Sequence, residues 1–218
     1  MPHSLNHLVN AFLLVYAGLF PIVNPIGGAP IFLGLTRDCT RQERNALALL
    51  VALNSFALLL GSLFVGSYVL EFFGITLPIV RVAGGLVVAA TGWNLLQTQN
   101  SAGGERAGHP AVAPTDAFYP LTMPITVGPG SMAVAITLGS QRPRESLPEI
   151  ALLVVAAVLG LIAIAATIYV CYRFAEGTVG VLGPRGTNVL VRLSAFILLC
   201  IGIEILWSGY SALIHAAS

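Results

Sequence analysis

The chain has 218 residues, of which 56% are hydrophobic and only 9% are charged, and its formal net charge is +1. A soluble domain carries roughly 25% charged residues, and a chain this short would keep too large a surface for so few of them to cover. The composition therefore excludes a soluble globular domain, and the weak net charge gives no field that would recruit nucleic acid. It predicts a protein whose main surroundings are the lipid bilayer.

Apolar segments recur along the chain at the length of a membrane span, which needs about 20 predominantly apolar residues. We expect spans near 8–34, 46–70, 77–97, 117–139, 149–173 and 188–213. The longest polar stretch, 99–116, predicts a flexible linker between a first unit at 1–98 and a second unit at 117–218. The sequence thus predicts an all-α, polytopic membrane protein with two three-helix halves.

Two of these spans, the first and the fourth, are interrupted by proline and glycine. The first reads FPIVNPIGGAP over 20–30, and the fourth reads YPLTMPITVGPGS over 119–131. Proline removes a helix donor and clashes with the preceding turn, and glycine permits the backbone angles that follow. We therefore expect a broken or re-entrant helix at each place instead of a straight span.

The two breaks occupy corresponding places in the two halves. The segment Gly74–Leu96 also aligns loosely with Gly183–Leu206, which places Arg81 opposite Arg192. Because each half has an odd number of spans, the second half must be inverted relative to the first. Inverted repeats with paired interrupted helices indicate a secondary transporter with its site near the middle of the membrane.

The orientation in the membrane follows from the arginine residues, since short cytoplasmic loops carry an excess of positive charge. The loops after the first, third and fifth spans hold more arginine than those on the opposite face. We expect this face to be cytoplasmic, with both termini outside.

The breaks are the predicted substrate site. Freed amides at half-helix N-termini suit an anion or carboxylate, and freed carbonyls suit a cation or an ammonium group, so together they suit a zwitterion such as an amino acid. The competing interpretation is a kink that serves only helix packing. The residues predicted to line the site are Asn24, Pro25, Gly27, Gly28, Thr126, Gly128, Gly130 and Ser131.

Four other polar residues in the spans are candidates for proton coupling or gating. Glu204 lies well inside the sixth span, where a carboxylate is costly and usually functional, although it could instead be a structural carboxyl group. Arg81 and Arg192 lie near helix starts, where they either snorkel to the interface or gate the site. Asn94 either gates or, like Thr91, forms hydrogen bonds between helices.

Catalytic chemistry has no visible basis in the sequence. The cysteine and histidine residues match no metal-ligand spacing, no glycine-rich phosphate loop follows a strand, and no nucleophile has a supporting histidine and acid. We therefore expect neither an enzyme nor a protein with a metal or another cofactor.

Several segments resemble the MarC family of bacterial membrane proteins. They are NPIG at 24–27, RQERN at 41–45, GITLPIVRVAGG at 74–85 and PLTMPITVGPG at 120–130, and the resemblance extends over nearly the whole chain. It implies six spans, a bacterial inner membrane and a small polar substrate. Some members of that family are regarded as neutral amino acid transporters, and the family is grouped with small-solute exporters.

These observations predict a secondary transporter of small neutral solutes, with neutral amino acids as the first choice, that works by alternating access. One rival is a channel for ions or small solutes, which would conduct without saturation. Another is a membrane scaffold that transports nothing. The sequence leaves open the solute, the direction of transport, whether H⁺ or Na⁺ is the coupling ion, and whether the chain forms a homo-oligomer.

Overall fold

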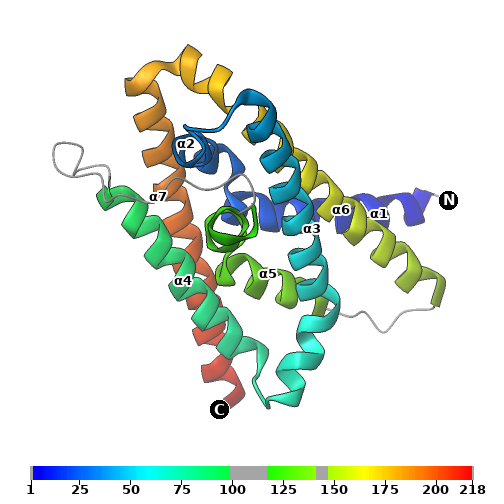
Figure 1. The fold of residues 1–218 in the computed structure, drawn as a ribbon. Helices are drawn as coiled ribbons and strands as arrows, with labels where there is room; N and C mark the ends of the chain where they lie inside the picture. Colours follow the sequence, from blue (N-terminus) through cyan, green and yellow to red (C-terminus); the bar gives the residue numbers. More distant parts are fainter. Residues whose placement is uncertain (1, 99–116, 141–146, 218) are drawn as a thin grey trace.

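The computed structural model describes residues 2–98, 117–140 and 147–217, and every regular element within them is a helix (Figure 1). The all-α prediction is thereby confirmed, while the predicted linker at 99–116 lies outside the described residues. In chain order the elements are α1 (Pro2–Val23), α2 (Pro25–Leu35), α3 (Arg41–Phe72), α4 (Leu77–Thr98), η2 (Ala117–Thr126), α5 (Pro129–Ser140), α6 (Leu147–Arg173) and α7 (Ala175–Ala217).

Among the described residues, four helices are long and apolar enough to cross a membrane: α3, α4, α6 and α7. Two further pairs pass the same test together but are bent, α1 and α2 by 41° and η2 and α5 by 69°. With each bent pair counted as one span, the chain has up to six spans. The bends occur at the two interruptions that the proline and glycine residues predict.

The first bend is built around Asn24, which adopts the left-handed conformation at φ 48° and ψ 55°. Its side-chain oxygen accepts a hydrogen bond from the Gly27 amide at 3.1 Å and so caps α2. Asparagine is one of the few residues other than glycine that visits this conformation routinely. Pro25 follows at the first helical position, where its fixed φ suits a helix start and its missing N–H costs nothing.

The second bend is more irregular because two proline residues force the residues before them out of the helical conformation. Tyr119 and Met123, which precede Pro120 and Pro124, have extended backbone angles inside η2. A residue before proline is disfavoured in the helical region. Within this irregular segment the hydroxyl of Thr126 donates to the carbonyl of Leu121 at 2.7 Å.

The stretch between the spans predicted at 149–173 and 188–213 is not an extended loop. This stretch is helical and belongs to α7, which breaks only at Gly183, where φ is 66°. Gly74, just before α4, has a φ of 67°. Positive φ favours glycine. Gly74 thus marks the turn before α4, and Gly183 marks the break after which the long part of α7 begins.

The buried core joins α1, α2, α3, η2, α5 and α6, and its largest fully buried side chains include Phe32, Leu47, Leu121 and Tyr172. Helices α4 and α7 lie side by side along one edge of this core (Figure 1). They run antiparallel, since Gly85 lies against Leu206 on α7 while Gly92 lies against Leu199.

Glycines allow α4 and α7 to approach this closely. A Cβ atom at Gly202 would overlap the backbone of Ala89, and one at Gly85 would overlap the backbone of Leu206. Small residues at a helix interface in a membrane let the backbones come together and gain van der Waals contact.

We expect Gly202→Ala to lower the free energy of unfolding in detergent by about 1–3 kcal/mol, the usual cost of overpacking. Gly61→Ala is the matched control, because a Cβ atom there meets nothing within 4 Å. Alanine in an exposed helix is favoured over glycine by up to about 1 kcal/mol, so this control should be neutral or stabilising. Equal thermal stability of the two variants would contradict the close α4–α7 packing.

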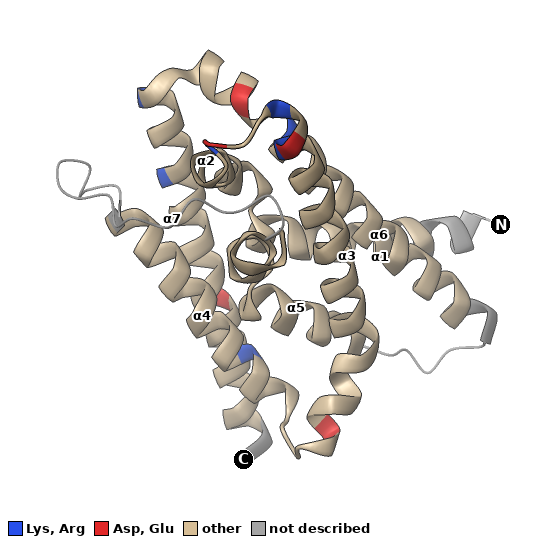
Figure 2. Ribbon diagram, viewed as in Figure 1, with Lys and Arg blue, Asp and Glu red and all other residues tan. Residues whose placement is uncertain are grey.

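The outer surface of the helices is largely apolar and suits lipid. Large apolar side chains such as Leu53, Val155 and Leu193 are about half exposed. Figure 2 shows most of the charged residues gathered at one end of the bundle, around the start of α3 and the first part of α7. At this end Arg44 donates to the carbonyls of Thr36 and Cys39 beyond the end of α2 and forms an ion pair with Glu176 at 3.1 Å.

Candidate functional site

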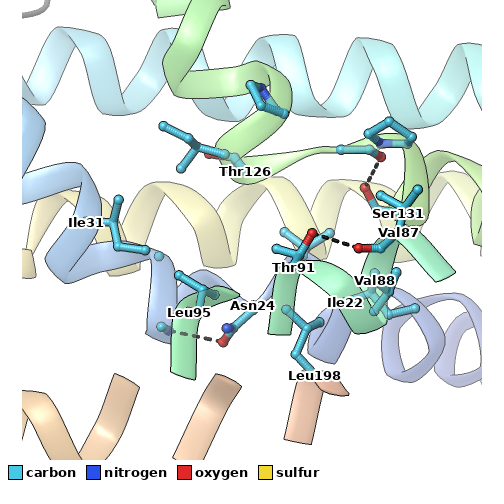
Figure 3. Close-up of a pocket in the computed structure, with 18 residues that line it drawn as sticks. Ile22, Asn24, Ile31, Val87, Val88, Thr91, Leu95, Thr126, Ser131 and Leu198 are labelled. Carbon is cyan, nitrogen blue, oxygen red and sulfur yellow. Dashed lines mark hydrogen bonds between the residues drawn. The ribbon is translucent and has the colours of Figure 1, made fainter. Parts of the chain in front are cut away.

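Both helix breaks line one cavity of about 130 Å³ (Figure 3). The end of α1 and the start of α2 form one side, and the end of η2 and the start of α5 form another. The predicted site residues that line it are Asn24, Gly27, Gly28, Thr126, Gly128, Gly130 and Ser131, while Pro25 is buried and does not line it. Residues about 100 positions apart in the sequence are thus brought to a single space.

The first wall presents a polar side chain and the start of a helix. Asn24 is half-buried, and its side-chain oxygen is taken by the Gly27 amide. In that orientation the amide nitrogen of Asn24 retains its donor hydrogens for other partners. The Gly28 amide closes the first turn of α2 by donating to the Asn24 carbonyl at 2.9 Å.

The second wall presents the start of α5. The Met132 amide donates to the Gly128 carbonyl at 3.1 Å, so the amides of Gly130 and Ser131 precede the first bond of the helix and have no acceptor within it. The Ser131 hydroxyl is buried and donates to Gly128 at 2.9 Å. The cavity therefore faces two half-helix N-termini, each with the positive end of its dipole directed at the site.

The third wall comes from α4 and α7, and the sequence did not predict it. It is apolar except for one hydroxyl, and consists of Val87, Val88, Thr91, Leu95 and Leu198. Thr91 was expected to bond between helices, but its hydroxyl donates to the Val87 carbonyl of its own helix at 2.8 Å. In the sequence, the glycines of α4 indicate close helix packing and not a cavity wall. No sequence feature near Leu198 indicates that this residue lines the cavity.

The four coupling or gating candidates do not line the cavity, and no charged side chain is among its described lining residues. Glu204 lies well inside the predicted sixth span, and its side chain is exposed on the outer surface of α7. The reason is helical periodicity: Gly202 faces α4, and two residues later a helix has turned by about 200°. Arg192 and Asn94 are also exposed, and Arg81 lies half-buried beside Gly209.

Comparison with known proteins agrees with this architecture. A family model described as "MarC family integral membrane protein" matches residues 9–214. The chain belongs to the MarC family. The protein named "UPF0056 inner membrane protein MarC" from Salmonella typhimurium is 32% identical over 199 residues, which cover 88% of this chain and 90% of that protein.

The protein of the same name from Escherichia coli O1:K1 is 31% identical over 200 residues, with the same coverage of each chain. No solved structure matches the chain. These names place the relatives in the inner membrane and specify no substrate. Together with the apolar helices, they identify this MarC-family chain as a multi-pass inner-membrane protein.

The size and lining of the cavity in this MarC-family protein limit what it can hold. Pockets for drug-sized ligands have volumes of roughly 300–1,000 Å³, so about 130 Å³ suits a solute of few atoms. The α5 N-terminus offers the backbone amides of Gly130 and Ser131, and the Asn24 side chain offers an amide donor at the start of α2. Thr126 and Ser131 offer hydroxyl oxygens, and the α4–α7 wall offers apolar contact. A small zwitterion, which carries one negative and one positive group, could use the amide donors, the hydroxyl oxygens and the apolar wall together.

Proposed function

We propose that this protein is a secondary transporter of small neutral solutes, with neutral amino acids as the first choice, and that it works by alternating access. The observation that carries the proposal is the meeting of two half-helix N-termini, one from each half of the chain, at one small cavity whose described lining residues are all uncharged. Broken backbone at membrane depth has to be satisfied by protein, water or a ligand, because lipid offers no hydrogen-bond partners.

We further propose that the two halves are inverted repeats. A bent pair followed by two long helices occurs twice in the described chain. The packing partners also correspond: α1 and α2 pack on α6 as η2 and α5 pack on α3, and α2 packs on α7 as α5 packs on α4. The positive φ of Gly74 and Gly183 supports the same correspondence.

The position of the cavity supports alternating access. It lies where the broken helices of the buried core meet the α4–α7 pair, so its walls come from two groups of helices. A shift of one group against the other would open the cavity to one face of the membrane and close it to the other, as in transporters built from repeats.

We also propose that the charged end of the bundle is cytoplasmic and that both termini are outside. Four arginine residues support this orientation, because they lie at that end in the α2–α3 connection, the start of α3 and the first part of α7 (Figure 2). They are Arg37, Arg41, Arg44 and Arg185.

The test is uptake of labelled glycine, alanine and serine into proteoliposomes that contain the pure protein, with and without a pH or sodium gradient. We expect saturable accumulation driven by one of the two gradients. Flux that rises linearly with solute concentration would identify a channel instead. No flux from protein shown to be folded would favour the scaffold.

Glu204→Gln tests a coupling role for the carboxylate. Since Glu204 does not line the cavity, we expect this variant to keep its KM for the solute within about twofold, an energy of less than 0.5 kcal/mol. If protons drive transport, as we propose for this mid-membrane carboxylate, the rate should lose its dependence on pH. An unchanged pH profile would remove Glu204 from the mechanism.

A further inference from the structure

The side chain that joins the two breaks does not line the cavity. Tyr172, near the end of α6, is fully buried, and its ring stacks on Phe32 of α2 with 4.5 Å between the ring centroids. Phe32 and Gly28 are four residues apart and share one face of α2. The tyrosine therefore lies along this face, with its ring against Phe32 and its hydroxyl against Gly28.

The Tyr172 hydroxyl contacts cavity-lining residues of both breaks. Its oxygen lies 2.8 Å from the Thr126 hydroxyl, at the end of η2. A Cβ atom added to Gly28 would come within 2.8 Å of the same oxygen. One buried oxygen thus lies between the start of α2 and the segment that leads into α5.

The direction of this hydrogen bond follows from the other bond of Thr126. The single hydroxyl hydrogen of Thr126 is donated to the Leu121 carbonyl at 2.7 Å, so Tyr172 must be the donor to Thr126. Loss of the Tyr172 hydroxyl leaves the bond from Thr126 to Leu121 intact, and no hydrogen-bond donor is left without an acceptor. It removes only the link between α6 and the second break.

We propose that Tyr172 is a positioning residue of the solute site, whose hydroxyl holds the two breaks at the separation that lets both half-helix N-termini face one solute. This inference rests on the proposed transport function and extends it to a residue outside the cavity. It also gives a reason for glycine at position 28, because any side chain there would meet the Tyr172 hydroxyl.

The first test compares two tyrosine variants in the proteoliposome assay. Tyr172→Phe keeps the ring and removes the hydroxyl. Tyr16→Phe is the matched control, because the Tyr16 hydroxyl also bonds a threonine of another helix, Thr167 of α6, at 3.1 Å, and neither residue lines the cavity. Both variants lose one tyrosine–threonine hydrogen bond between helices.

We expect Tyr172→Phe to raise KM roughly two- to tenfold, the value of one hydrogen bond, with the maximal rate per folded protein retained. Tyr16→Phe should leave KM unchanged. Equal KM values for the two variants would overturn the proposal while wild-type transport remained intact. A wild-type protein without flux would instead overturn the proposed function.

The second test needs no transport and measures thermal stability in a double-mutant cycle. Gly28→Ala should destabilise the wild-type protein, because the new methyl group meets the Tyr172 hydroxyl. In the Tyr172→Phe background the nearest ring carbons would remain about 3.5 Å away, an ordinary contact, and alanine is the better helix former. The same substitution should then be neutral or stabilising. Equal destabilisation in both backgrounds would overturn the proposed contact.

Discussion

Asn24→Ala is expected to lower solute transport at least about tenfold while the protein still inserts and folds. Alanine has no oxygen to accept the Gly27 amide, and the loss of such a cap costs about 1 kcal/mol. It also fits poorly at the φ of 48° found there, which costs a further 1–2 kcal/mol or so. Both costs fall on the cavity wall, where a loss of about 1.4 kcal/mol of solute affinity corresponds to a tenfold change.

Asn24→Gly distinguishes the effect of the backbone conformation on transport from the effect of the Asn24 side chain. Glycine tolerates positive φ and is a nearly equivalent helix cap, with a cost of a few tenths of a kcal/mol. We expect this variant to melt close to the wild-type temperature and yet to transport poorly, because the amide donor in the cavity is gone. Wild-type uptake rates for both variants would exclude Asn24 from the site.

Ser131→Asp is expected to abolish measurable uptake, a loss of at least about 100-fold. Ser131 lines the cavity in the first turn of α5 and is buried, so a carboxylate there would occupy the helix N-terminus that we propose for the carboxylate of the solute. Anionic side chains are favoured at such positions, typically by 0.3–1 kcal/mol or so. This attraction offsets part of the cost of burying the charge, and thermal unfolding in detergent establishes that the variant is folded.

Ser131→Asn is the control for this second experiment, because it has the same shape as aspartate and no charge. We expect it to retain more transport than Ser131→Asp, with a weaker affinity than the wild type. The measurement is uptake of labelled alanine per folded protein, with folding followed by thermal unfolding in detergent. Equal uptake by the two variants would show that the α5 N-terminus does not hold an anionic group of the solute.

The two breaks illustrate why part of the site could be predicted from residue types alone. Proline before or within a helix restricts the backbone angles of its neighbours and removes a hydrogen-bond donor, and this effect does not depend on tertiary contacts. The bends at Asn24 and between Thr126 and Pro129 therefore occur where these rules place them. Their meeting at one cavity is a hypothesis from repeat symmetry, and the seven predicted site residues that line the cavity are consistent with it.

Glu204 shows the limit of the same reasoning. Its place in an apolar span indicated a buried carboxylate, but the side chain points away from α4 because Gly202 and Gly209 occupy the packed face. Hydrophobicity does not distinguish the lipid-facing side of a membrane helix from the protein-facing side, since lipid chains are as apolar as leucine. Only the docking of α4 on α7 decided which residues are exposed.

The sequence by itself determined the all-α membrane class, the positions of the long helices and the two bends, because length, hydropathy, proline and glycine act locally along the chain. The tertiary structure alone decided the apolar wall from α4 and α7, the outward position of Glu204 and the burial of Tyr172 between the two breaks. These features depend on contacts between residues far apart in sequence, which arise only when helices of similar apolar composition pack on particular faces.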